Sequence, residues 1–208
     1  MGIAVIGNGD LAKQLLSFVN PPLESNTVYF DDFHEINNIT HYPFLNWRDG
    51  AFSDYNFIIG LGYHNLKIKN KIITDLLKLN RKILSYCHPS SFINESSKIG
   101  RSVFIYPMCN VDQNVTLNDG VVLNNSVVVS HDSIIGKCTY ISPGVNISGK
   151  VVIGKNCFVG TGTTISNGVI IGDNVIIGIG SVVTSNVKDN LCVIGNPLKV
   201  LNNPIKLQ

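Results

Sequence analysis

The sequence carries little charge. Only 14% of its 208 residues are charged, against about 25% in an average globular protein. A hydrophobic content of 44% excludes a disordered or polyelectrolyte chain, so neutral polar residues, chiefly Asn and Ser, must cover the surface. The net charge is +2, and no run of basic residues provides the electrostatic footprint of a nucleic-acid-binding protein.

Long apolar runs and paired cysteines are also missing. No stretch approaches the ~20 apolar residues of a membrane span, and the N-terminus lacks the basic and long apolar regions of a signal peptide. We therefore expect a cytoplasmic protein with no membrane partner. The five cysteines form no CxxC pair, which favours buried free thiols over a disulfide framework or a metal site.

What the sequence does contain is a repeat of six residues. From Ile93 to Val183 every sixth residue is aliphatic, sixteen in succession, and the residue four places after each is Ser, Thr, Cys or Val. A helix of 3.6 residues per turn would scatter these positions, whereas short strands would stack them inward, coil over coil. Intervening Gly, Asn and Asp indicate corners with positive φ. Three hexads per triangular coil predict a parallel β-helix of about five coils, on the order of 25 Å tall.

The first 86 residues lack the repeat and have an α/β pattern. Apolar runs predict buried strands, and amphipathic stretches between them predict helices. The expected strands are residues 3–7, 28–30, 57–60 and 83–85, with helices near 10–19 and 65–79. This is a small βαβ-type, half-Rossmann-like domain with a parallel sheet. We therefore divide the chain into residues 1–86, a β-helix over 87–190 and a tail over 191–208.

The first predicted strand ends in a glycine turn, Gly7-Asn8-Gly9, with Ala12 and Asp31 at the spacing of a dinucleotide-binding fingerprint. Only half of a doubly wound sheet is present, so a nicotinamide would have no second half of the sheet to bind against. Backbone amides at the turn suit a single nucleotide. The Asp31-Asp32 pair either forms a plain turn or, at a strand's carboxyl end, binds sugar hydroxyl and base N–H groups.

One histidine stands out within the hexads. His131 is the only histidine among them, and Asp132 follows it. Because Val129 and Ser133 should point inward, His131 should face outward near a corner, either as a solvated surface residue or as a general base oriented by Asp132. Neighbours on a strand point to opposite faces, so the pair can act together only if a corner joins them.

Cysteine is a poor candidate for the nucleophile. Cys109 and Cys157 occupy small inward positions of the repeat, where a thiol is an apolar filler with little thiolate character. Direct attack on an acyl donor within a ternary complex is therefore preferred over a covalent acetyl-cysteine intermediate.

Five motifs resemble one enzyme family along nearly the whole chain: GNGDLAKQL, FDDF at Phe30–Phe33, IIGLG at Ile58–Gly62, HPSSFINESSKIG at His88–Gly100 and LNNSVVVSHDSIIG at Leu123–Gly136. The sequence thereby resembles the hexapeptide-repeat acetyltransferases of bacterial surface-sugar synthesis, including lipopolysaccharide O-antigen synthesis. This branch contains nucleotide-sugar amine N-acetyltransferases and sialic acid O-acetyltransferases. The resemblance implies a left-handed β-helix, a homotrimer, and acetyl-CoA bound without a metal between neighbouring β-helices.

The resemblance also implies roles for individual residues. His131 matches the general base and Asp132 the acid that orients it, while the N–H of Gly149 is expected to point at the thioester carbonyl. Tyr140 stands where some relatives carry a second histidine near the acetyl group, so that contact is not carried over. The expected substrate-binding residues are Gly7, Asn8, Gly9, Asp31, Asp32, Gly62 and Asn124. The expected cofactor-binding residues are Tyr140, Gly149, Gly160, Gly178, Asn196 and Pro197.

The expected function is acetyl-CoA-dependent N-acetylation of a nucleotide-linked amino sugar, such as a 4-amino-4,6-dideoxyhexose. O-acetylation of a sialic acid remains an alternative that needs the same base but no nucleotide. A non-catalytic β-helix that scaffolds a complex or binds a metabolite is the alternative outside the enzymes.

Overall fold

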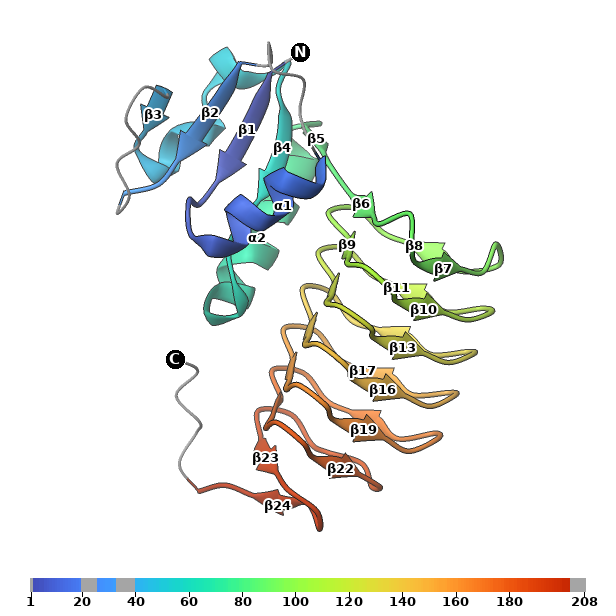
Figure 1. Cartoon of the computed structure of the whole chain (residues 1–208). Helices are drawn as coiled ribbons and strands as arrows, with labels where there is room; N and C mark the ends of the chain where they lie inside the picture. The colour runs from blue at the N-terminus through green and yellow to red at the C-terminus, as the bar shows by residue number, and fades with distance from the viewer. Residues whose placement is uncertain (1, 20–25, 33–39, 203–208) are drawn as a thin grey trace. The chain divides into compact units, whose positions relative to one another are not determined.

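The computed structural model describes residues 2–19, 26–32 and 40–202, and the chain divides into two compact units, Met1–Tyr86 and Cys87–Gln208 (Figure 1). The fold class expected from the sequence is confirmed: a small α/β unit precedes a parallel β-helix built from hexads.

The N-terminal unit is a five-stranded parallel sheet in the order β3-β2-β1-β4-β5. Its strands are β1 (Ile3–Ile6), β2 (Thr27–Phe30), β3 (Thr40–Tyr42), β4 (Asn56–Ile59) and β5 (Lys82–Ile83). The helices are α1 (Asp10–Val19) and α2 (Leu66–Lys78), with 3-10 turns η1 (Phe44–Arg48), η2 (Gly50–Phe52) and η3 (Tyr63–Asn65). The sequence predicted the elements of this unit except β3 and the 3-10 turns, and it placed β5 slightly too late.

Close packing of α1 on β4 fixes the glycine turn that follows β1. All residues of β1 and β4 are buried, and α1 buries Ala12 and Leu15. A Cβ on Gly60 would collide with Ala12, so this glycine lets the helix lie directly over the end of β4. The strand ends and the first turn of α1 are thereby held together.

The second unit consists of three parallel sheets, which we name by one strand each, and all their strands except β23 have two residues. The β7 sheet contains β7 (Phe92–Ile93), β10 (Asn110–Val111), β13 (Val128–Val129), β16 (Asn146–Ile147), β19 (Thr164–Ile165) and β22 (Val182–Val183). The β8 sheet contains β8 (Lys98–Ile99), β11 (Thr116–Leu117), β14 (Ile134–Ile135), β17 (Val152–Ile153) and β20 (Ile170–Ile171). The β9 sheet contains β6 (Tyr86–Cys87), β9 (Phe104–Ile105), β12 (Val122–Leu123), β15 (Tyr140–Ile141), β18 (Phe158–Val159), β21 (Ile176–Ile177), β23 (Cys192–Ile194) and the antiparallel β24 (Lys199–Val200).

The register of these sheets repeats every 18 residues until the last coil, where β23 pairs with β21 at an offset of 16. Val111 pairs with Val129, and Val129 pairs with Ile147, so three hexads complete one coil, as the sequence predicted. The aliphatic position of each hexad is buried from Ile105 to Val183. In the first coil this position is not buried: Ile99 is 39% exposed, because no coil precedes it in the β8 sheet.

Most hexads also contain one residue with left-handed backbone. Every sixth residue from 102 to 180 has a positive φ. Asn and Asp tolerate this region better than other side chains, and glycine adopts it freely. The positions are Ser102, Met108, Asn114, Gly120, Ser126, Asp132, Cys138, Gly144, Lys150, Asn156, Gly162, Gly168, Asn174 and Gly180.

Six glycines expected at positive-φ corners have another role. At each, an added Cβ would collide with the next coil, and none has a positive φ. The expectation of positive φ is therefore wrong for them, because close approach between coils is what requires glycine there. They are Gly100, Gly136, Gly154, Gly160, Gly172 and Gly178.

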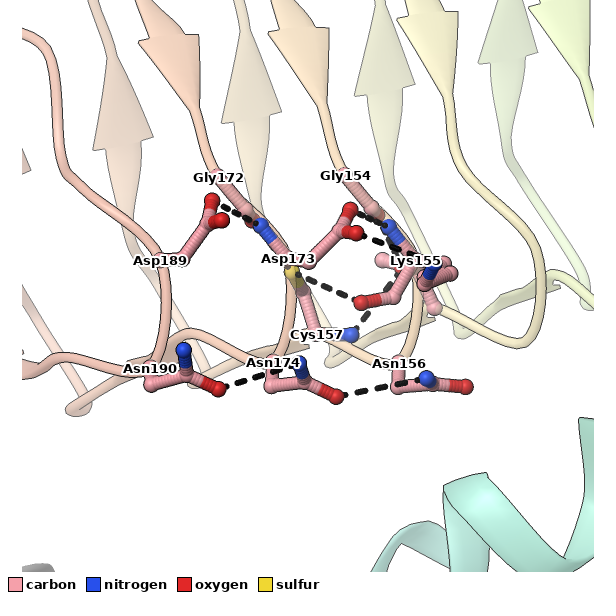
Figure 2. Close-up of polar contacts among 10 residues, drawn as sticks. Gly154, Lys155, Asn156, Cys157, Gly172, Asp173, Asn174, Asp189 and Asn190 are labelled. Atoms are coloured by element: carbon pink, nitrogen blue, oxygen red, sulfur yellow. Dashed lines mark hydrogen bonds and ion pairs between the residues drawn. The ribbon is translucent and has the colours of Figure 1, made fainter.

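Carboxylates link successive coils at the corner between the β8 and β9 sheets (Figure 2). The Lys155 N–H donates to Oδ1 of Asp173 at 3.0 Å, and the Asp173 N–H donates to Oδ1 of Asp189 at 2.9 Å. This backbone donor from Lys155 is the main cause that lowers the pKa of Asp173. Beside them runs a ladder of side-chain amides from Asn156, Asn174 and Asn190. Such ladders satisfy the polar groups of the corner and fix the stacking of coils.

Two glycine substitutions should separate close approach from backbone conformation. A Cβ on Gly136 would lie against the Gly154 backbone, whereas one on Gly144, at φ +66°, would meet no atom within 4 Å. We expect Gly136→Ala to lower the free energy of unfolding by at least ~3 kcal/mol through overpacking, and Gly144→Ala by about 1–2 kcal/mol through backbone strain. Chemical denaturation measures both; equal losses would contradict the close-approach explanation.

Candidate active site

The carboxyl ends of β1, β2 and β4 surround a pocket of about 320 Å³ in the N-terminal unit. Such ends are where ligands bind in open α/β sheets. All the substrate-binding residues predicted in this unit line it: Gly7, Asn8, Gly9, Asp31, Asp32 and Gly62. The last residue of the FDDF motif, Phe33, lies outside the described residues.

The two aspartates of the pocket play different parts. Asp31 is buried, and its Oδ2 accepts the N–H of Asn8 at 2.7 Å, which ties the glycine turn to the end of β2. Asp32 is exposed, and its Oδ1 accepts the N–H of Phe44 at 2.9 Å. Asp31 therefore forms part of the wall, while a ligand can reach the carboxylate of Asp32.

The sequence missed the apolar part of this pocket. Phe44, Leu61 and Ile68 line it together with Gly60 and Asn65. Leu61 lies inside the IIGLG motif, which was a usable signal. Phe44 follows the unpredicted strand β3, and Ile68 lies 48% exposed on α2, so neither had a local pattern that pointed to a pocket.

The second cluster lies at the corner between β13 and β14. Val129 and Ser133 are buried as predicted, and the side chains of His131 and Asp132 are 40% and 41% exposed. Asp132 has a φ of +59°, which breaks the alternation of an extended strand. Its Oδ2 lies 2.9 Å from Nδ1 of His131. The corner thus brings the predicted pair together.

Asp132 has the charge that this arrangement requires. Its pKa is lowered first by the hydrogen bond with His131, then by one from Asn114 Nδ2 at 3.1 Å, and further by the charges of His131 and Lys150. When the imidazole carries its proton on Nδ1, it donates to the ionised carboxylate. Nε2 then keeps a lone pair that can accept a proton from a substrate.

Gly149 lies beside the free edge of that imidazole, one coil further along. A Cβ on Gly149 would lie 2.6 Å from both Cε1 and Nε2 of His131. The N–H of Gly149 meets no acceptor among the described residues. A proton acceptor and an unused N–H donor are therefore adjacent, which is the combination that acyl transfer uses for its nucleophile and its oxyanion.

The other predicted residues of the β-helix lie at the corner between the β9 and β7 sheets or on the β9 sheet itself. Asn124 Nδ2 donates to the hydroxyl of Tyr140 at 2.8 Å, and Tyr140 stacks on Phe158. A Cβ on Gly160 would collide with the backbone at Gly178, and one on Gly178 would collide with the side chain of Ile194. Asn196 and Pro197 form the turn between β23 and β24. Within one chain, the β7 sheet separates these residues from His131.

The cysteines fit the expectation of buried thiols with one exception. Cys109, Cys138, Cys157 and Cys192 are buried, whereas Cys87 is exposed because it lies in the first, open coil. Burial raises the pKa of Cys157 to about 11 and raises that of Cys109. Both inward thiols are therefore protonated and poor nucleophiles at neutral pH.

The described residues, 2–19, 26–32 and 40–202, contain neither a cluster of metal ligands nor a long apolar helix. In these ranges no group of three His, Cys, Asp or Glu side chains could hold a metal ion. In the same ranges no helix is both long and apolar enough to cross a membrane.

Family models and one curated protein match parts of the β-helix. The model "Bacterial transferase hexapeptide (six repeats)" matches residues 132–167, and "Hexapeptide repeat of succinyl-transferase" matches 150–185. An acyl-[acyl-carrier-protein]–UDP-N-acetylglucosamine O-acyltransferase of Mesorhizobium japonicum is 40% identical over 58 residues, which are 28% of this chain. The match spans only 19% of that protein's length.

Solved structures match nearly the whole chain. The acetyltransferase domain of PglB from Neisseria gonorrhoeae is 27% identical, with a TM-score of 0.84 over 96% of this chain and 99% of that one. The same domain is also known in complex with acetyl coenzyme A. PerB from Caulobacter crescentus, solved with CoA and GDP-perosamine, is 21% identical, with a TM-score of 0.86 over 97% of each chain, a likeness of fold. These findings confirm the resemblance to hexapeptide-repeat sugar acetyltransferases and support an acyltransferase.

A methyl group at Gly149 should displace the imidazole without unfolding the protein. Because the colliding atoms are the end of the His131 side chain and not backbone, we expect Gly149→Ala to rotate the ring off its position by about 1 Å or more and break the bond to Asp132. A crystal structure of the variant measures this. Gly50→Ala, which meets no atom within 4 Å, is the control; an unmoved ring in Gly149→Ala would contradict the expectation.

Proposed function

We propose that this hexapeptide-repeat protein is an acetyl-CoA-dependent N-acetyltransferase that acts on the amine of a nucleotide-linked amino sugar, of the 4-amino-4,6-dideoxyhexose type. The observation that carries the proposal is the placement of the His131 ring edge against Gly149, with Asp132 on the opposite nitrogen. The whole-chain match to an acetyltransferase domain solved with acetyl coenzyme A supports the donor. GDP-perosamine in the PerB structure prompts the class of acceptor.

The proposed chemistry is a direct transfer. The neutral amine of the sugar attacks the thioester carbonyl, and Nε2 of His131 takes the proton that the nitrogen loses. Asp132 stabilises the imidazolium through Nδ1, and the Gly149 N–H donates to the oxyanion. When the carbon–sulfur bond breaks, the imidazolium returns the proton to the CoA thiolate. The buried thiols of Cys109 and Cys157 take no part.

The N-terminal pocket is proposed to bind the nucleotide part of the acceptor. Its glycine turn leads directly into α1, so backbone N–H groups at the helix N-terminus suit an anionic phosphate. Asp32 offers an exposed carboxylate to N–H or hydroxyl donors. The apolar side chains of Phe44, Leu61 and Ile68 suit the flat faces of a base or sugar. A sialic acid acceptor, which carries no nucleotide, would leave this pocket without use.

Acetyl-CoA is proposed to bind between copies of the chain in a homotrimer. Tyr140, Gly160 and Gly178 belong to a different edge of the β-helix from His131, so one chain cannot present both sets to one cofactor. A second copy can supply the missing set. The β8 sheet also presents Ile134 and Ile170, 42% and 52% exposed, as apolar surface that association would cover.

Removal of the His131 imidazole should abolish turnover but not binding. We expect His131→Ala to lower kcat by about 10²–10⁴-fold, the usual contribution of a general base, with the Kd of acetyl-CoA and the oligomeric state unchanged. Steady-state kinetics and calorimetry measure these quantities. His88→Ala, a histidine of the same unit that contacts Ser90, is the control. A nearly normal kcat in His131→Ala would remove this residue as the base.

Asp32 should be required for the nucleotide sugar alone. We expect Asp32→Ala to weaken sugar-nucleotide binding about tenfold, the loss of one hydrogen bond to a charged group, and to leave acetyl-CoA binding unchanged. Thermal shifts with acetyl-CoA and with UDP-, GDP- and dTDP-linked amino sugars measure this, because a ligand that binds the folded state raises Tm. Asp54→Ala, an exposed aspartate elsewhere in the unit, is the control.

The same screen distinguishes the alternatives. Stabilisation by acetyl-CoA without any effect of a nucleotide sugar would favour the sialic acid O-acetyltransferase. Stabilisation by neither ligand would favour a non-catalytic scaffold.

A further inference from the structure

The His131–Asp132 pair has a third partner in the preceding coil. Asn114 lies 18 residues before Asp132, at the same corner, and the two have nearly equal φ values of +58° and +59°. Its Nδ2 donates to Oδ1 of Asp132 at 3.1 Å, while Oδ2 of the same carboxylate faces Nδ1 of His131 at 2.9 Å. Each carboxylate oxygen therefore has its own partner, one from each coil.

Two separate hydrogen bonds restrict the rotation of the Asp132 carboxylate about its terminal torsion. The terminal torsion of an aspartate is broad, and the carboxylate of Asp132 is exposed, so packing does not hold it. With a single hydrogen bond to His131, the carboxylate could rotate and its oxygens could bond to water in place of the imidazole. A second bond at Oδ1 fixes the plane of the carboxylate with Oδ2 toward the imidazole.

A charge from the following coil also acts on the carboxylate of Asp132. Lys150 occupies the same corner one coil further along, where its charge acts on Asp132, and its N–H donates to the carbonyl of His131 at 2.8 Å. Lys150, and His131 only when its ring is protonated, are the charged groups that act on Asp132 among the described residues. Lys150 therefore attracts the carboxylate from one side, and the neutral amide of Asn114 holds it from the other.

We propose that Asn114 is a positioning residue for acetyl transfer: by holding Oδ1 of Asp132 it directs Oδ2 to Nδ1 of His131 and keeps Nε2 of the neutral imidazole unprotonated. This role rests on the proposed function of His131. It needs no contact between Asn114 and either substrate.

A positioning role of Asn114 differs from a purely structural role in the stacking of coils, and matched variants distinguish the two. Asn156 provides the matched comparison, since it has a φ of +56° and donates its amide to Asn174 in the next coil. It lies at a different corner of the β-helix from His131. Glycine tolerates positive φ, so Asn114→Gly and Asn156→Gly each remove one amide ladder bond without straining the backbone. Asn114→Asp replaces the donor by an acceptor of the same size.

The first measurement is the tautomer of His131, which needs no turnover. The nitrogen chemical shifts of its ring in the full-length protein report which nitrogen carries the proton, and the His131→Asn spectrum identifies the signals. We expect the Nδ1–H form to dominate in the parent and in Asn156→Gly, and a mixture of tautomers in both Asn114 variants. Parent-like tautomer populations in Asn114→Gly would overturn the proposal.

The second measurement is the kinetic consequence. We expect Asn114→Gly to lower kcat about tenfold, as for loss of a hydrogen bond to a charged group, with KM for both substrates unchanged and Asn156→Gly within about twofold of the parent. A kcat equal to that of Asn156→Gly would also overturn the proposal. If the parent itself transfers no acetyl group, the proposed function fails, and the tautomer measurement still decides whether Asn114 positions the pair.

Discussion

The stacking of coils at a fixed register of 18 residues is the constraint on which the β-helix and its candidate site depend. Parallel pairing sets Val129 over Val111 and under Ile147, and so places corner residues 18 apart against one another. Asn114, Asp132 and Lys150 form one such series, and His131 and Gly149 belong to the neighbouring one. The contacts between coils at the candidate site therefore arise from the same register that builds the core.

The sequence revealed this register better than it revealed the site. A period of six fixed the inward positions because burial of one aliphatic residue per hexad leaves an unbroken pattern. It also placed His131 outward, since Val129 and Ser133 both point in. It did not decide whether Asp132 could reach His131, because alternation along a strand separates neighbours. The positive φ of Asp132 settles that question, and a corner conformation is not readable from residue type in a chain where Ser, Lys and Met adopt it too.

Other parts of the candidate site had no local signal at all. Phe44 and Ile68 reach the N-terminal pocket through the tertiary packing of η1 and α2 around the strand ends. Asn114 looks like any other asparagine of an Asn-rich chain, and only its place one coil before Asp132 gives it a partner. Glycine was misread at corners for a related reason: Gly136 and Gly154 serve contacts between coils, which no property of their own hexads shows.

The exposure of the His131–Asp132 pair has a consequence for how it must work. With both side chains about 40% exposed, water screens their attraction, and an exposed ion pair by itself contributes little. Orientation must then come from groups that the stacked coils hold in place: the amide of Asn114, which donates to Asp132, and Gly149, whose missing side chain leaves space for the His131 ring. A ligand or a second chain that covers this corner would remove the water and strengthen every interaction already in place. The rigid coils thus supply the geometry, and the covering group supplies the low dielectric that makes the geometry effective.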